Sequence, residues 1–219
     1  MNRKTTPVVT FSVMKKNIFT LILMAVIASF SISAATKTAE SVVSRAVTLI
    51  EKAPSLSARI SVTQGGQEST GELIISGKKF SVDLPGIKNW FDGKSLWSYS
   101  ASAGEVNLTE PTAEELAEIN PLTYLTAVKS SFTKRLLKSQ DAGINVVELT
   151  PKTKKGGIKK VVASFSEKSG FPVRFIIYPD GQSAVTIAIK ELKQGKLLPV
   201  STFRLQEKLL PGVEVIDLR

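Results

Sequence analysis

The side chains that most often carry enzyme chemistry are missing from this sequence. Its 219 residues contain no His and no Cys, which excludes imidazole bases, thiol nucleophiles, disulfides and metal sites built from these residues. The densest group of acids is Glu114, Glu115 and Glu118. Thr112 and Glu115 have the spacing of a helix capping box, and the other two fit a solvated helix face better than a catalytic pair. We therefore expect a protein that is not an enzyme and has no cofactor or metal.

Two further motifs suggest chemistry but have simpler explanations. Four lysines, Lys154, Lys155, Lys159 and Lys160, flank Gly156-Gly157, but the spacing is not that of a P-loop and the segment lies between two predicted strands. A solvated hairpin tip is the favoured interpretation, which leaves open a contact with an anionic lipid surface or an acidic partner. The three residues 107–109 match a glycosylation acceptor, a pattern too short to be informative.

The N-terminus has the features of an export signal. Lys15 and Lys16 precede an apolar run over residues 18–28, and small residues follow up to Ala35. The run is shorter than the ~20 apolar residues of a membrane-spanning helix, so a cleaved signal is favoured over a retained anchor. We predict a signal peptide over residues 1–35, with translation starting at Met14 or at the first residue, and a single exported domain over residues 36–219.

The positive charge of the chain does not predict a nucleic-acid partner. There are 29 Lys and Arg against 19 Asp and Glu, and about +6 of the net charge of +10 remains beyond the first 35 residues. Export argues against nucleic acid. In addition, Trp90, Phe91, Trp97 and Tyr99 gather around one predicted hairpin rather than alternating with lysines.

Apolar periodicity predicts one helix followed mainly by strands. The helix spans residues 38–53, with Val42, Ala46 and Ile50 on one face, and Pro54 ends it. A helix that covers the protein's own core is favoured over one that binds membranes. Beyond it the period changes to two, with Gly-rich turns between short runs. The predicted strands are 57–64, 68–76, 79–84, 87–91, 95–100, 104–109, 143–150, 158–166, 172–178, 184–193 and one near 200–207.

Two short helices interrupt the predicted strands midway. One begins at Thr112, and the second begins at Asn120 with Pro121 at its first position. The fold class is therefore mainly β with a few helices (α+β). An antiparallel sheet of this size must curl or close, which leaves room for an apolar cavity that the helices can cover.

Several motifs resemble the periplasmic outer-membrane lipoprotein carriers, the LolA-like family. The most telling is Phe91-Asp92-Gly93-Lys94-Ser95-Leu96-Trp97-Ser98-Tyr99, and Gly71–Ile75, Asn120-Pro121-Leu122, Leu149–Lys152 and Pro211–Asp217 follow the family in order and spacing. The resemblance implies a half-open β-barrel lidded by helices around an apolar cavity. It also implies a monomeric carrier that shields the acyl chains of lipoproteins.

The same resemblance implies the partners and the site. An inner-membrane ABC-type complex would release cargo to the carrier, and an outer-membrane acceptor would receive it. A carrier of another lipid, or a lipoprotein-sensing regulatory protein of the same fold, is the alternative. The residues expected to contact lipid are strand positions of one parity, with four positions near the mouth or lid: Ile60, Val62, Leu73, Ile75, Phe80, Val82, Leu96, Phe165, Phe175, Ile187, Ile189 and Phe203, and then Trp90, Trp97, Leu122 and Leu125.

One departure from the family concerns the lid. Members commonly carry an Arg-Pro pair after the strand that corresponds to residues 71–76, and its Arg bonds to the lid. This chain has Lys78 and Lys79 there, and a lysine cannot form the planar fork of a guanidinium. The lid is therefore expected to be held by apolar packing alone.

Overall fold

The computed structural model describes residues 37–112, 115–116, 119–120, 131–153, 157–206, 208 and 210–219. Residues 37–219 form one compact unit. The predicted signal peptide, the second midway helix and the predicted lid residues Leu122 and Leu125 lie outside the described residues. Among the described residues, no helix is both long enough and apolar enough to cross a membrane.

The predicted first helix is confirmed as α2 (Ala39–Lys52). Thr38 caps it through a reciprocal pair of hydrogen bonds, in which the Ser41 N–H donates to Thr38 Oγ1 and the Thr38 N–H donates to Ser41 Oγ, both at 3.1 Å. The apolar stripe is buried, and Ala46 and Val47 within it are inaccessible to solvent. α2 is therefore a core-covering helix, as the sequence indicated.

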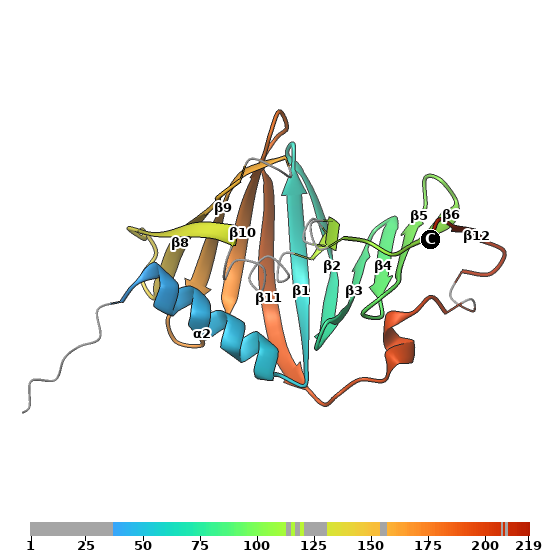
Figure 1. The fold of residues 1–219 in the computed structure, drawn as a ribbon, viewed down its shortest axis with the longest axis horizontal. Coiled ribbons are helices and arrows are strands. Elements are labelled where there is room, and N and C mark those ends of the chain that lie inside the picture. Colours follow the sequence, from blue (N-terminus) through green and yellow to red (C-terminus); the bar gives the residue numbers. More distant parts are fainter. Residues whose placement is uncertain are drawn as a thin grey trace, which may run out of the picture. The chain divides into compact units, whose positions relative to one another are not determined.

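Within the described residues, twelve strands form one sheet in the order β12-β6-β5-β4-β3-β2-β1-β11-β10-β9-β8-β7 (Figure 1). Neighbouring strands are antiparallel except for β12, which runs parallel to β6. The strands are β1 (Ser55–Gln64), β2 (Gln67–Ser76), β3 (Lys79–Leu84), β4 (Ile87–Phe91), β5 (Leu96–Ser100), β6 (Glu105–Thr109), β7 (Phe132–Leu137), β8 (Ile144–Pro151), β9 (Ile158–Ser166), β10 (Pro172–Pro179), β11 (Val185–Gly195) and β12 (Glu214–Asp217).

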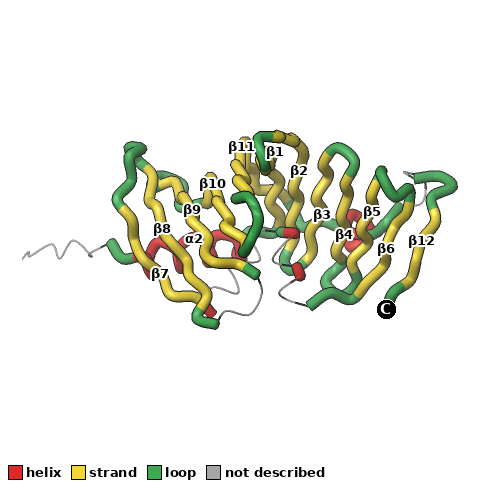
Figure 2. Tube along the Cα trace, turned by 90° about the horizontal axis from the view of Figure 1, so that it is seen from above, coloured by secondary structure: helices red, strands yellow, loops and turns green. Residues whose placement is uncertain are grey.

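The sheet is strongly curved and does not close. Seen from above, it follows an arch with β7 and β12 at its two ends and β11 and β1 at the bend (Figure 2). Side chains of one parity along each strand meet on the concave face, where α2 packs against the half formed by β7 to β11. This curved, unclosed sheet confirms the mainly β fold class.

The C-terminal region corrects the predicted strand near 200–207. Residues Val200–Phe203 form the 3-10 helix η1 after Pro199, because the Phe203 side chain turns inward to a fully buried position rather than continuing a ladder. Two short edge strands, β7 and β12, were not predicted. Neither shows a regular alternation, since an edge strand is paired on only one side and tolerates mixed side chains.

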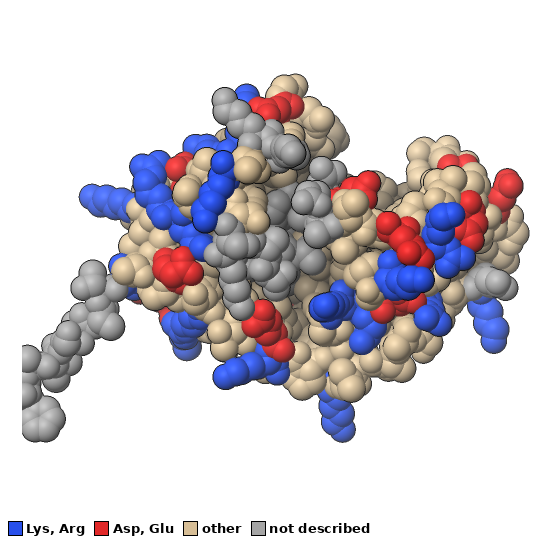
Figure 3. Space-filling view, in the orientation of Figure 1, with Lys and Arg blue, Asp and Glu red and all other residues tan. Residues whose placement is uncertain are grey.

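Charges are distributed unevenly over this unit. Lys and Arg side chains gather over β7, β8 and β9 at the left of Figure 3, while Asp and Glu are more frequent towards β4, β5 and β12. Arg135 and Lys160 bind the same Glu148 carboxylate from the two neighbouring strands at 2.7 and 3.0 Å. These pairs lie on the convex face, whereas the concave face is mostly apolar.

Candidate functional site

The concave face of the sheet is mostly apolar. Register places Ile60 opposite Ile189, Leu73 opposite Val82, and Phe175 opposite Ile187. Eleven of the twelve predicted strand positions share the face, either inside the apolar core or packed against it: Ile60, Val62, Leu73, Ile75, Phe80, Val82, Leu96, Phe165, Phe175, Ile187 and Ile189. Their contact with lipid remains a prediction.

Much of this face is covered by α2 in the present conformation. Val43, Ala46 and Val47 of the helix are buried against the sheet, and Phe165 and Phe175 are almost inaccessible to solvent. Side chains packed to this density leave no room for a ligand. The open part of the concave face therefore lies beyond the helix, towards the β1–β2 and β10–β11 turns.

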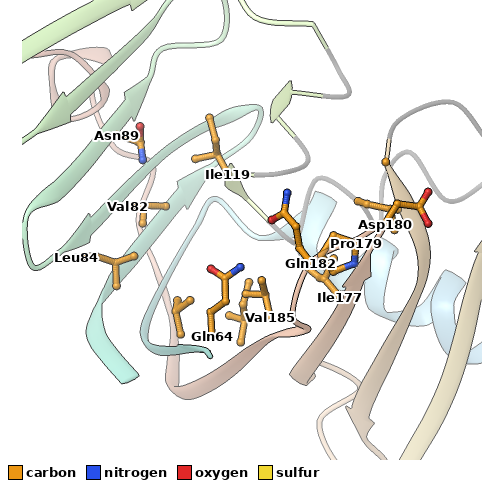
Figure 4. Close-up of a pocket in the computed structure, with 14 residues that line it drawn as sticks. Gln64, Val82, Leu84, Asn89, Ile119, Ile177, Pro179, Asp180, Gln182 and Val185 are labelled. Carbon is orange, nitrogen blue, oxygen red and sulfur yellow. The ribbon is translucent and has the colours of Figure 1, made fainter. Parts of the chain in front are cut away.

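An open cavity of about 550 Å³ lies in that uncovered part. Val82, Leu84 and Asn89 of β3 and β4 lie on one side of it, Ile177 and Val185 lie on the facing side, and Ile119 lies between them (Figure 4). The volume falls within the range of about 300–1,000 Å³ typical of small-ligand pockets. Three predicted residues, Val62, Val82 and Ile187, line this cavity, and Leu96 lines a separate one beside the C-terminus.

The polar groups of the cavity are mainly neutral amides. Gln64 and Gln182 lie at the turn ends of β1 and β11, and Asn89 stands on β4 within the apolar face. Asp180 is the one charged residue among the described lining residues, and Lys159 lies 3.6 Å from its carboxylate. The cavity thus offers apolar walls, amide donors and acceptors, and no cationic side chain among the described residues that line it.

The sequence of the chain decides its family. It matches the model of the family described as outer membrane lipoprotein carrier protein LolA over residues 27–182. The chain belongs to this LolA family. No curated protein sequence matches it significantly.

Solved structures with similar folds share little sequence with this LolA-family chain. An uncharacterized conserved protein from Thermus thermophilus is 12% identical with a TM-score of 0.53, covering 82% of this chain and 98% of that chain. A LolA superfamily protein from Nitrosomonas europaea is 12% identical with a TM-score of 0.43, covering 78% and 99%. The MucA/MucB complex of Pseudomonas aeruginosa matches at 12% identity and a TM-score of 0.40, covering 78% and 62%. The Thermus likeness supports the fold alone.

Three aromatic residues assigned from sequence to the lipid site do not lie on the concave face. Trp90 pairs with Trp97 across β4 and β5, on the face opposite to Phe91 and Leu96. Phe203 is buried outside the concave core, with the Lys79 ammonium 5.9 Å from its ring. The two tryptophans have the strand parity that points to the other face of the sheet. Phe203 comes after the end of β11, where strand pairing has stopped, so parity does not apply to it.

The polar lining residues were not found by sequence reasoning. Asn89 has the same parity as Phe91, and it opposes Val82 in the register. The available signal was that Asn89 is a polar residue at an inward position of an apolar strand. The aromatic residues of the same hairpin were assigned to the site instead. Gln64 and Gln182 lie at turn ends, where polar residues are ordinary and carry no signal.

Polar contacts add to the apolar packing that holds α2 against the sheet in this LolA-family chain. Arg45 of α2 donates hydrogen bonds from its guanidinium to the Glu167 and Lys168 carbonyl oxygens in the β9–β10 turn, at 3.0 and 3.2 Å. Lys134 of β7 lies 2.9 Å from Glu40, and its hydrogen bond lowers the pKa of that carboxyl. The planar guanidinium that fixes α2 to the sheet therefore belongs to the helix itself and not to the β2–β3 turn.

The turn in the family's most telling motif is an anchoring point. The Asp92 carboxylate accepts hydrogen bonds from the Lys94 and Ser95 N–H groups, both at 3.0 Å, and from Arg204 Nε. Burial raises the pKa of Asp92, but the hydrogen bonds from Ser95, Lys94 and Arg204 together outweigh burial and lower it. The motif therefore fixes the β4–β5 turn and has no direct place in the cavity.

Glu115 of the midway segment behaves as the capping box predicts, whereas Glu114 and Glu118 lie outside the described residues. The Thr112 N–H donates to the Glu115 carboxylate at 2.7 Å, and the Glu115 N–H donates to Thr112 Oγ1 at 3.3 Å. The Thr112 hydrogen bonds lower the pKa of Glu115. Within the described ranges, no group of three or more potential ligand side chains is placed to hold a metal ion.

Proposed function

We propose that this protein is a periplasmic carrier that shields the acyl chains of lipoproteins on its concave face and moves them from the inner to the outer membrane. The observation that carries the proposal is the open cavity of about 550 Å³, whose apolar wall residues belong to or pack against the apolar core of the arch. Exposing an acyl chain to water costs roughly 0.8 kcal/mol per CH₂, so a lipidated protein needs such a shield to cross an aqueous compartment. Membership of the LolA family supports the same assignment.

The carrier binds its cargo without chemical conversion. Acyl chains enter between the β3 wall and the β10–β11 wall, and Val82, Ile177 and Ile187 contact them first. Movement of α2 away from the sheet extends the surface to side chains that are now buried, such as Phe175. Cargo comes from an inner-membrane ABC-type complex and passes to an outer-membrane acceptor, each of which stabilises one position of the helix.

Binding of an acyl ligand tests this function directly. Native mass spectrometry of the protein purified from the cell envelope should show bound lipid or acylated peptide. Val185→Trp places a bulky ring in the cavity, whereas Thr186→Trp places the same ring on the opposite face of the same strand. We expect the first variant to lose at least tenfold in affinity for a fluorescent acylated peptide, and the second to bind as the parent does.

Depletion in cells tests the cargo. Lipoproteins should accumulate in the inner membrane when the protein is removed. If lipoproteins reach the outer membrane normally and a different lipid accumulates, the protein carries that lipid instead. If neither distribution changes and no ligand co-purifies, the carrier function is wrong.

A further inference from the structure

One end of the sheet, remote from the cavity, brings together three segments that are distant in sequence. The Ser55 hydroxyl donates to the Lys196 carbonyl oxygen at 2.7 Å, and the Ser76 hydroxyl donates to the Pro54 carbonyl oxygen at 2.7 Å. The end of α2, the β2–β3 turn and the segment after β11 therefore meet around the start of β1 (Figure 1). We call this end the basic rim and define it by Lys52, Lys78, Lys193, Lys196, Leu197 and Val200.

The four lysines of the basic rim are exposed and unpaired. None of them takes part in the ion pairs seen among the described residues. Two acids lie nearby in sequence, Glu51 on α2 and Glu191 on β11, and Glu191 is paired with Arg59 at 3.1 Å. Lys or Arg side chains project from the lower border of the molecule in Figure 3, where this end of the sheet lies. The rim thus carries excess positive charge.

Two apolar side chains protrude beside these lysines. Leu197 is 73% exposed and Val200 is 43% exposed. They stand on the segment that leaves β11 and turns at Pro199, and Lys196 immediately precedes Leu197. Single exposed apolar residues are common on protein surfaces. A pair that projects from a basic rim has the composition of elements that insert into the headgroup layer of an anionic membrane.

We propose that the basic rim docks the protein on an anionic phospholipid surface. Leu197 and Val200 enter the interface, and the lysines contact the headgroup phosphates. A protein partner fits these observations less well. Long, unpaired lysine side chains can follow mobile headgroup phosphates without needing a fixed complementary surface. Gln64 at the cavity lies at the other end of β1, roughly 30 Å away at ~3.3 Å per residue. Docking by the rim therefore leaves the cavity accessible. A variant that loses membrane binding at the rim should still bind an acyl ligand in the cavity.

Vesicle co-sedimentation tests the docking. The protein purified from the envelope is mixed with vesicles of phosphatidylglycerol and phosphatidylcholine, or of phosphatidylcholine alone. We expect binding to the anionic vesicles only, weakened by added NaCl. Each lysine near an anionic surface contributes about a fivefold effect, so Lys193→Ala with Lys196→Ala should weaken binding roughly 25-fold. Leu197→Ser should weaken it as well, with no change in the electrostatic salt dependence.

A charge-matched control separates the rim from the overall positive charge. Lys88→Ala with Lys160→Ala removes the same charge away from the rim, and it should leave vesicle binding within twofold of the parent. Equal losses in the two double variants would show that the attraction is delocalised, and the proposal would be wrong. Equal binding to neutral and anionic vesicles, or no binding to either, would also overturn it. Acylated-peptide binding in the cavity should be unchanged in every rim variant, so failure here is distinct from failure of the carrier function.

Discussion

Arg204 donates a hydrogen bond from Nε to Asp92 Oδ2 at 2.7 Å and so joins the C-terminal segment to the turn between β4 and β5. The Asp92 side chain is only 7% exposed, and Phe203 beside the arginine is fully buried. The segment after β11 is therefore fastened across the convex face before it reaches β12. This link closes a large loop of the chain with one charged hydrogen bond and one buried ring.

Replacing Asp92 should destabilise the fold. Asp92→Asn keeps the shape of the side chain but weakens the hydrogen bonds to the Lys94 and Ser95 N–H groups and removes the ion pair. Hydrogen bonds to charged groups contribute about 1.5–3 kcal/mol, and we expect a loss of that order in the free energy of unfolding, measured by urea titration. Asp83→Asn is the control, because Asp83 forms an exposed pair with Lys88 whose loss should cost less than about 1 kcal/mol. Equal losses in the two variants would contradict the anchoring role.

The same carboxylate should make stability depend on acid pH. The folded pKa of Asp92 lies below its ordinary value of 3.8. The stabilising contribution is therefore complete above the unfolded pKa and is lost as the pH falls through the folded pKa. Unfolding free energies measured at neutral pH and again below the ordinary pKa should show the parent losing more stability than Asp92→Asn. A constant difference between the two proteins over this range would count against the assignment.

The sequence predicts most of this architecture because apolar and polar residues alternate along many of its strands, which identifies a buried and an exposed face. Alternation in β1, β3 and β11 assigned one parity to the inside, and the register confirms that eleven predicted residues share the concave face. Trp97 was assigned from the cluster of aromatic residues around its hairpin and not from parity, and the register places it on the face opposite to Leu96. Which inward residues border open space depends on where α2 packs, and strand periodicity holds no information on helix placement. For that reason Val82 borders the cavity while Phe175 is covered.

The clasp between α2 and the β9–β10 turn should depend on Gly170. A Cβ at this position would lie 2.6 Å from Arg45 Nε and 2.8 Å from Leu49 Cδ1, and the backbone φ is +80°. Gly170→Ala should therefore displace Arg45 and raise the hydrogen exchange of residues 39–52. Gly143→Ala is the matched control, with φ +73° and nothing within 4 Å of the added Cβ.

The two glycine variants separate the effect of backbone strain at a positive φ from the effect of the contact between the added Cβ and Arg45. A non-glycine residue in the left-handed region costs roughly 1–2 kcal/mol, and both variants carry that cost. Only Gly170→Ala should add faster exchange in α2 and easier loading of an acylated peptide. If the exchange of α2 is the same in both variants, Arg45 does not clasp the helix to the turn.

The amide lining of the cavity predicts selectivity for the polar end of the ligand. Gln64, Asn89 and Gln182 can pair with ester and amide carbonyl groups, whereas the described lining offers no cation to neutralise a phosphate. A diacylated peptide with a neutral polar end should therefore bind at least tenfold more tightly than phosphatidylglycerol with the same acyl chains. Gln182→Lys should narrow this ratio by improving phosphatidylglycerol binding, and Gln182→Met, which keeps a similar length without charge, should not. Competition against a fluorescent acylated peptide measures both ligands in one assay, and equal affinities in the parent protein would show that only the acyl chains are recognised.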